Sequence, residues 1–234
     1  MSNYPGTLIV FEGIDGCGKT STIEEIYRQL SEEGHKVVML ANIVEGSATG
    51  GAIRTMLSNK GDTIDDIRII NLYLSELRYA IHNKMNGVVK YLEEGYIVLC
   101  SRWFYSTYAY IKQTEATSNI IYNSTYDLPE PDLSIYLKVS VDIAVERIRN
   151  RNTTNTFDYF EKRDKLEAIK NRYDTLYSNT LYLINTNKKI VTNGLIINNE
   201  KDFEYNTLMI KELIVTTEQL KQKKKLINSG DNNE

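Results

Sequence analysis

The stretch "LIVFEGIDGCGKTSTIEEIYRQL", Leu8 to Leu30, places an apolar run, a glycine-rich turn and a helical pattern in direct succession. The run from Gly6 to Gly13 is short and rich in β-forming residues, which favours a buried strand. The residues from Thr20 to Glu33 are compatible with a helix. Between them, Gly13 to Thr20 fits the pattern G-x-x-x-x-G-K-[ST] in the strand–turn–helix context that this motif requires. We therefore expect a loop that holds the phosphates of a nucleoside triphosphate.

Each residue type in this loop has a physical task. The glycines let backbone N–H groups turn inward around a phosphate, and the helix N-terminus adds the positive end of its dipole. Lys19 is expected to reach the β- and γ-phosphates, and the Thr20 hydroxyl to ligate Mg²⁺. A carboxylate at Asp15 is electrostatically unfavourable there, so we expect it either to accept a hydrogen bond from a hydroxyl of an acceptor substrate or to face solvent. The expected nucleotide-binding set is Gly13, Asp15, Gly16, Cys17, Gly18, Lys19, Thr20 and Ser21.

Composition places the chain among ordinary globular proteins. It has 234 residues, of which 41% are hydrophobic and 25% charged, which suits one domain with a substantial core. The formal charge of -3 gives no argument for binding nucleic acid or a membrane. We interpret the two cysteines as reduced, and no apolar run is long enough for a signal peptide or a membrane span. We expect a soluble, cytoplasmic protein.

The rest of the chain alternates between short apolar runs and long helix-compatible stretches. Alternation of this kind predicts an α/β fold with a parallel sheet that helices cover on both faces. The last residues, 218–234, lose apolar periodicity and become lysine-rich, so we expect a disordered polar tail there. Further strands are expected at Val37–Leu40, Tyr96–Cys100, Leu133–Val139 and Gly194–Ile197, and further helices at Ile64–Glu93, Val141–Asn150 and Phe160–Tyr182.

Several ordered segments together resemble the thymidylate kinase family. They are "FEGIDGCGKT", "GGAIRTML" (Gly50 to Leu57), "LYLSELR" (Leu72 to Arg78), "EEGYIVLCSRWFYSTYAY" (Glu93 to Tyr110), "LPEPDLSIYLKVSVDIAVERI" (Leu128 to Ile148), and "DYFE" with "IKNRYDTL". The resemblance implies a P-loop NTPase fold of three α/β/α layers with a helical lid, here at about residues 147–163 of a single nucleoside monophosphate kinase domain, 1–217. It implies ATP- and Mg²⁺-dependent phosphorylation of dTMP to dTDP, by a homodimer.

The resemblance also implies how the acceptor nucleotide is held. Arg102 is expected to bind the monophosphate, Arg78 to contact the base, and Asp15 to approach the sugar. Arginine suits a phosphate because its fork donates two parallel hydrogen bonds and keeps its charge. Arg102 follows a predicted central strand at its C-terminal end, where ligands of open α/β sheets bind. Leu74 aligns with the base-stacking position, and Ser106, Thr107 and Tyr110 offer hydroxyls to the base or sugar.

The segment "ERIRNRNTTNTFDYFEKR" has the composition of a lid that closes over phosphates. Cations in such a lid neutralise the charge that spreads over the transferred group. The candidates are Arg149, Arg151 and Arg163, which with Lys19, Arg102 and Asp15 form the expected catalytic set. The sequence leaves open which of the three lid arginines reaches the γ-phosphoryl group.

The chain departs from the family pattern around the metal and the acceptor. Ser101 stands where the family has an aspartate, and Glu12 is a carboxylate that could substitute for it. "ANIVEGS", Ala41 to Ser47, replaces an Arg-Glu-Pro-Gly loop, and Ile111 replaces a glutamine. Another pyrimidine deoxynucleotide, such as dUMP or a 5-substituted dUMP, therefore remains an alternative acceptor. Two further alternatives are a deoxynucleoside kinase and a nucleotide-binding protein with impaired catalysis.

Overall fold

The computed structural model describes residues 3–41, 48–58, 66–151, 158–178, 190–191 and 193–230. Its centre is a five-stranded sheet, with all neighbouring strands parallel, in the order β2-β3-β1-β4-β5. The strands are β1 (Thr7–Glu12), β2 (Val37–Ala41), β3 (Ile97–Ser101), β4 (Leu133–Lys138) and β5 (Gly194–Asn198). This arrangement confirms the expected α/β fold and the P-loop NTPase architecture.

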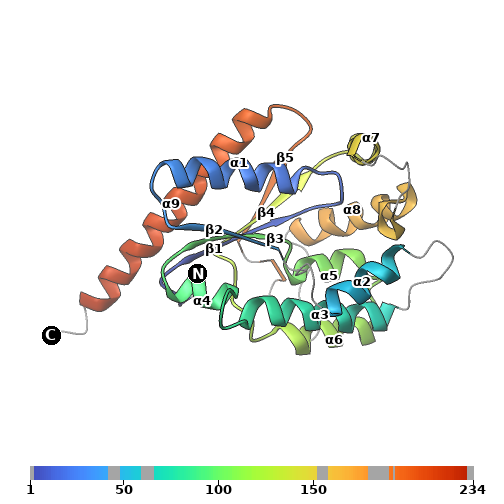
Figure 1. The fold of residues 1–234 in the computed structure, drawn as a ribbon, viewed down its shortest axis with the longest axis horizontal. Helices are drawn as coiled ribbons and strands as arrows, with labels where there is room; N and C mark the ends of the chain where they lie inside the picture. The colour runs from blue at the N-terminus through green and yellow to red at the C-terminus, as the bar shows by residue number, and fades with distance from the viewer. Residues whose placement is uncertain are drawn as a thin grey trace.

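Helices cover both faces of this sheet, which gives the predicted three layers. Helices α1 (Lys19–Glu32) and α9 (Phe203–Gly230) lie on one side, and α3 (Asp66–His82), α4 (Val88–Glu93), α5 (Phe104–Tyr110) and α6 (Glu115–Thr125) lie on the other (Figure 1). The remaining helical segments are α2 (Ala48–Ser58), α7 (Val141–Arg151), a 3₁₀ turn at Tyr159–Glu161, and α8 (Arg163–Tyr177).

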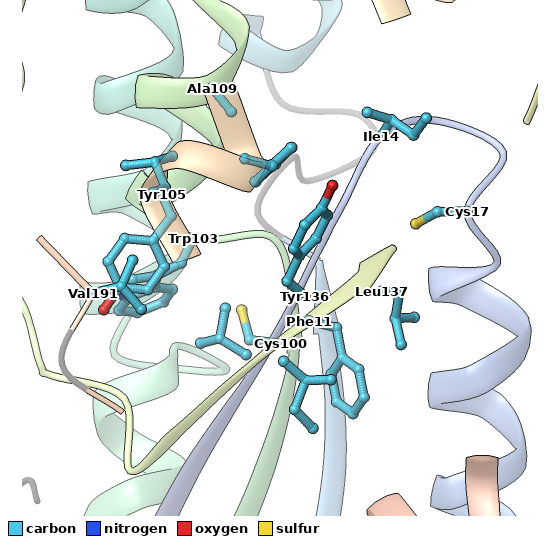
Figure 2. Close-up of a cluster of buried hydrophobic side chains, with 14 of the residues drawn as sticks. Phe11, Ile14, Cys17, Cys100, Trp103, Tyr105, Ala109, Tyr136, Leu137 and Val191 are labelled. Atoms are coloured by element: carbon cyan, nitrogen blue, oxygen red, sulfur yellow. The ribbon is translucent and has the colours of Figure 1, made fainter. Parts of the chain in front are cut away.

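The core follows from the burial of the central strands. All six residues of β1 are buried, because this strand has a parallel neighbour on each side and helices above and below. Figure 2 shows side chains of three adjacent strands, Phe11, Cys100 and Leu137, gathered at the sheet. Trp103 and Tyr105 extend this cluster toward α5, and both are at most 2% exposed. The cluster fixes the carboxyl ends of β1 and β3, where the predicted site lies.

The sequence predicts one long helix over Ile64–Glu93, and this prediction is wrong in one respect. The described part of this segment forms two helices. α3 ends at His82, and α4 begins at Val88. Between them the backbone turns at Gly87, whose N–H donates to the carbonyl of Asn83 at 2.8 Å. A Cβ on Gly87 would lie 2.4 Å from that carbonyl oxygen, so only glycine fits this close approach.

The predicted disordered tail over residues 218–234 is also wrong for 218–230, which continue α9 to Gly230. The helix continues there because lysine side chains on it bond to other parts of the chain. The Nζ atom of Lys221 donates to the carboxylate of Asp132 and to the Gly6 carbonyl, both at 2.5 Å, and Lys221 and Asp132 are at most 4% exposed. Removal of one partner from such a buried pair costs about 3–5 kcal/mol. Lys225 adds a bond to the Tyr4 carbonyl.

Two predicted features fall partly or wholly outside the described residues. The replacement for the Arg-Glu-Pro-Gly loop is described only at Ala41, and the threonine- and asparagine-rich middle of the lid, 152–157, is not described. Among the residues that are described, no helix is both long enough and apolar enough to cross a membrane.

Candidate active site at the phosphate loop

The loop between β1 and α1 has the backbone of a phosphate cradle. Gly16 and Gly18 have φ angles of 80° and 94°, in the left-handed region that favours glycine. A Cβ on Gly16 would lie 2.4 Å from the carbonyl oxygen of Ala144, and one on Gly18 would lie 2.9 Å from the amide nitrogen of Asn199. Successive turns of this kind direct backbone N–H groups toward one centre, which is a binding geometry for anions. The loop ends at Lys19, where the N-terminus of α1 adds to the same field.

The side chain of Lys19 lies within the loop. Its Nζ atom donates to the carbonyl oxygens of Gly13 and Ile14, both at 2.9 Å, and contacts the Cys17 sulfur at 3.5 Å. Burial, followed by the nearby charge of Arg102, lowers the pKa of Lys19. Thr20 and Ser21 in the first turn of α1 are exposed. A buried ammonium beside an exposed hydroxyl is a donor set that fits the phosphates of ATP and a bound Mg²⁺.

Two further residues support the loop from outside. Asn199, in the segment after β5, donates its side-chain amide to the Cys17 carbonyl at 2.9 Å. Arg147 of α7 donates to the same carbonyl at 3.5 Å and to the carbonyl of Asn199 at 3.0 Å. Arg147 falls at the start of the predicted lid, and the sequence predicts no role for it or for Asn199 in the phosphate loop. The position of Asn199 just after a parallel strand was the available signal, because loops at carboxyl strand ends build such sites.

Arg102 directly follows β3 and lies against the phosphate loop. Its guanidinium donates to the Asp15 carboxylate at 2.5 Å and to the Gly13 carbonyl at 3.3 Å. It also lies 4.6 Å from the centre of the Tyr110 ring, a cation–π distance. The backbone of Arg102 has a φ of 71°, which is unusual for a residue other than glycine and costs on the order of 1–3 kcal/mol. The surrounding contacts therefore hold this residue in a strained conformation.

Asp15 has the compensating partners that its position requires. Besides Arg102, it accepts a hydrogen bond from the Tyr110 hydroxyl at 2.9 Å. Burial on its own would raise the pKa of Asp15, but the charges of Arg102 and Lys19 outweigh it and lower that pKa. The carboxylate thus stays ionised and connects the loop to the strand end that carries Arg102.

A cavity opens beside this connection, and its lining combines a polar and an apolar end. The polar predicted residues Asp15, Arg102, Ser106, Thr107 and Tyr110 all contribute to it. The apolar part is supplied by α2, α3, the residue after α5, and the 3₁₀ turn, through Ile53, Leu57, Ile69, Ile70, Tyr73, Ile111 and Phe160. Asp158 and Glu161, which flank Phe160 in the sequence, also line the cavity. A cavity that has an arginine together with many apolar side chains suits a ligand with a phosphate and a ring.

Two predicted acceptor residues do not line this cavity. Leu74, on α3, is 3% exposed and packs into the hydrophobic core. Its neighbour Tyr73 lines the cavity. Adjacent residues of a helix point about 100° apart around its axis, so the two side chains lie on different faces. The pKa of Tyr73 is raised to about 12, chiefly by burial.

Arg78 is the second exception. Both of its terminal nitrogens bond to the carboxylate of Asp127, at 2.9 and 2.8 Å, and one also bonds to the Ser124 carbonyl. Asp127 follows α6, so the contact joins segments about 50 residues apart. In the sequence alone, nothing indicated that this carboxylate would meet Arg78.

The lid arginines are separated from one another. Arg151 pairs with Glu161 at 2.6 Å, and its charge helps to lower the pKa of Asp15. Arg163 forms an ion pair with Asp142 at the start of α7. Arg149 is exposed near the end of α7. Arg151 is therefore connected electrostatically to the phosphate loop through Asp15.

Glu12 ends β1 and is held there by hydrogen bonds from buried groups. It is fully buried and accepts hydrogen bonds from the Trp103 backbone at 2.7 Å, from Ser106 at 2.6 Å and from Tyr173 at 2.7 Å. Burial raises its pKa, and these hydrogen bonds oppose the increase. With both oxygens engaged, Glu12 is not available as a substitute for the aspartate that Ser101 replaces.

Comparisons with known proteins agree with this geometry. The family model described as thymidylate kinase matches residues 11–193. The chain is 30% identical over 176 residues to thymidylate kinase of Desulfotalea psychrophila, covering 75% of this chain and 84% of the relative. It is 32% identical over 179 residues to a probable thymidylate kinase of Staphylothermus marinus, covering 74% of this chain and 82% of that protein.

A solved structure shows the same fold. Thymidylate kinase from Candida albicans superposes with a TM-score of 0.67 at 19% identity, covering 90% of this chain and 92% of the other. The family model spans the phosphate loop, Arg102 and the described part of the lid. The chain therefore belongs to the thymidylate kinase family.

Proposed function

We propose that this protein transfers the γ-phosphoryl group of ATP to the phosphate of dTMP, giving dTDP. The observation that carries the proposal is the contact between Arg102 and the phosphate loop, through Asp15 and the Gly13 carbonyl. Asp15 of the phosphate loop and Arg102, which suits an acceptor phosphate, both line the cavity, so this cavity adjoins the donor cradle. In-line transfer between two phosphates requires such proximity.

The donor half is assigned to the phosphate loop. When bound, ATP with Mg²⁺ supplies the phosphoryl group and the charge that balances it. The loop N–H groups from Gly13 to Gly18 hold the phosphates, and Lys19 leaves the loop carbonyls to contact the outer ones. The Thr20 hydroxyl is the proposed protein ligand of Mg²⁺, and Ser21 adds a second exposed hydroxyl.

The acceptor half is assigned to the cavity. Arg102 binds the acceptor phosphate, and Asp15 accepts a hydrogen bond from the sugar. The buried hydroxyls of Ser106 and Thr107 and the ring of Tyr110 complete the polar end. The apolar end, with Tyr73 and Phe160, suits a pyrimidine ring, so dUMP and 5-substituted dUMP are the competing acceptors.

The lid supplies the remaining positive charge. Arg151 is the proposed cation for the transferred group, because its charge already acts on Asp15. Arg149 and Arg163 remain secondary candidates. Lid closure also excludes water, which would otherwise accept the phosphoryl group from ATP.

A deoxynucleoside kinase requires a carboxylate that takes a proton from a sugar hydroxyl. Among carboxylates at a strand end, Glu12 is the candidate for that base, and its oxygens accept hydrogen bonds from Trp103, Ser106 and Tyr173. The contacts of Glu12 and the presence of Arg102 both support a phosphorylated acceptor.

We also infer a cytoplasmic homodimer from the family. Support in the described residues comes from Ile67 and Tyr79 of α3 and from Tyr126 after α6, which are large apolar side chains 48%, 52% and 68% exposed. Light scattering at several concentrations tests this inference, and a monomer at all of them would contradict it.

A coupled assay of ADP release tests the reaction. ATP and Mg²⁺ are supplied with dTMP, dUMP, thymidine, dAMP or dGMP, and we expect the highest rate with dTMP. Phosphorylation of thymidine alone, or a highest rate with a purine nucleotide, would refute the proposal. Ser101→Asp is the informative variant for impaired catalysis, because a carboxylate orients Mg²⁺-bound water better than a hydroxyl does. We expect it to raise kcat.

A further inference from the structure

The strained backbone of Arg102 is held by residues from three separate parts of the chain. Its own N–H donates to the Phe11 carbonyl at 2.9 Å, which fixes the residue to the end of β1. The next N–H, of Trp103, donates to the Glu12 carboxylate at 2.7 Å. The left-handed conformation of Arg102 thus lies between two bonds to consecutive residues of β1. Glu12 therefore holds the backbone that directly follows Arg102.

Glu12 is itself held by hydroxyl groups. One carboxylate oxygen accepts from Trp103, and the other contacts the hydroxyls of Ser106 and Tyr173 at 2.6 and 2.7 Å. These two hydroxyls are also 2.8 Å apart, and the Ser106 oxygen accepts from the Arg102 guanidinium at 3.3 Å. Glu12, Ser106 and Tyr173 are all at most 2% exposed, so water does not compete for these bonds.

The ring of Tyr173 supports the same arginine from another side. It stacks on Tyr136 of β4, with ring centres 5.2 Å apart, and contacts the edge of Tyr110 at 6.4 Å. The Tyr110 ring in turn lies against the Arg102 guanidinium. Tyr173 is therefore connected to Arg102 in two ways, through the hydroxyl of Ser106 and through the ring of Tyr110.

Tyr173 lies on α8, the helix that follows the lid. The same helix begins at Arg163 and is preceded by the 3₁₀ turn that contains Phe160 and Glu161. The hydroxyl of Tyr173 donates to Glu12 and so links this helix to the end of β1.

We propose that Tyr173 is a positioning residue for the acceptor phosphate, acting through Glu12 and Ser106 on the conformation of Arg102. This inference rests on the proposed function, because it concerns the binding of dTMP. Without the hydroxyl, one oxygen of Glu12 loses a donor, and the turn at Arg102 can relax from its strained conformation. The arginine then spends less time aimed at the phosphate, while the ATP loop is unaffected.

Tyr173→Phe tests this role, because it removes only the oxygen and keeps both ring contacts. We expect the KM for dTMP to rise about tenfold, with the KM for ATP within twofold of the wild type. Calorimetric titration of dTMP gives the dissociation constant directly and is expected to change by the same factor.

Tyr177→Phe is the matched control. Tyr177 lies on the same helix, is 5% exposed, and forms a hydrogen bond with the buried Ser134 hydroxyl. The two variants lose comparable buried hydrogen bonds, so they should lower the melting temperature similarly. Only Tyr173→Phe should change the KM for dTMP. An equal change in both variants, or none in either, would overturn the proposal.

A double variant tests whether the effect passes through Arg102. In an Arg102→Ala background, Tyr173→Phe should change dTMP binding by less than twofold, since the group that it positions is gone. Multiplication of the two single effects would show independent action and contradict the proposal. A wild-type protein inactive on dTMP would refute the proposed function itself, whereas an active wild type with an unaffected Tyr173→Phe would refute only the positioning role.

Discussion

The phosphate loop and the acceptor cavity meet at Asp15 and Arg102, but they are built in different ways. The backbone of the loop is defined by its own glycines and by Lys19, which bonds to carbonyls five and six positions away, while Asn199 and Arg147 support it from outside. The cavity is assembled from α2, α3, α5 and the 3₁₀ turn, with lining residues that range from position 15 to position 161. The donor site therefore depends mainly on local backbone geometry, whereas the acceptor site depends on the packing of helices that are distant in the sequence.

The largest effect is expected from a substitution that impairs only the donor site, the phosphate loop. Lys19→Ala removes the ammonium that contacts the outer phosphates, so we expect kcat/KM to fall by about 10³ or more. Binding of dTMP, measured by calorimetry in the absence of ATP, should stay within twofold of the wild type. Loss of dTMP binding as well would show that the two halves do not act separately.

The next largest effect is expected from a substitution that impairs the acceptor site and leaves the phosphate loop intact. Arg102→Lys keeps the charge but loses the fork that donates two bonds to a phosphate. A charge-assisted hydrogen bond contributes about 1.5–3 kcal/mol, so kcat/KM for dTMP should fall about 10- to 100-fold. ATP affinity, followed with a non-hydrolysable analogue, should change less than threefold. An unchanged rate with dTMP would remove the main support for the proposed function.

The same contrast explains how much of the site can be predicted from the sequence. Gly16, Gly18 and Lys19 are predictable because the motif defines the local backbone, and the structure has these residues in that backbone. Arg102 is predictable from its place at a strand end. The face of α3 is harder to predict. Adjacent Tyr73 and Leu74 differ by one helical step, and only packing decides which of them lines the cavity.

The two errors in the fold have a related cause. The helix pattern over Ile64–Glu93 continues across Gly87, and the break depends on a close contact with Asn83 that periodicity does not encode. The end of α9 looks polar because Lys221 replaces an apolar anchor, and its partner Asp132 lies 89 residues away. Pattern analysis assigns lysines to solvent, so it fails where a buried carboxylate receives one.

A smaller effect sharpens the boundary of the acceptor site. Arg78 pairs with Asp127, and both side chains are about 40% exposed. An exposed ion pair contributes about 0–1 kcal/mol, so Arg78→Ala should lower the free energy of unfolding by no more than that amount. We expect the KM for dTMP to change less than threefold. A tenfold rise would mean that Arg78 leaves Asp127 and contacts the base in the complex, as the family resemblance implies.

The smallest expected effects concern the pH dependence of stability, through two carboxylates three positions apart, Glu12 and Asp15. Burial raises the pKa of Glu12 above its ordinary value of 4.5, so the folded state binds its proton more tightly than the unfolded state does. Stability from this group is therefore complete below about pH 4.5 and is lost as the pH rises through the folded pKa. Glu12→Gln should gain stability relative to the wild type over that range, by at most about 1.4 kcal/mol per pH unit.

Asp15→Asn is expected to behave with the opposite sign. Although burial opposes it, the charges of Arg102 and Lys19 lower the pKa of Asp15 below 3.8, so the unfolded state takes up this proton first as the pH falls. The wild type should then lose stability relative to Asp15→Asn below about pH 3.8, and the difference should be constant at higher pH. Urea unfolding at several pH values measures both series. Curves of the same sign for the two variants would contradict the distinction, because they would place both carboxylates in one electrostatic environment.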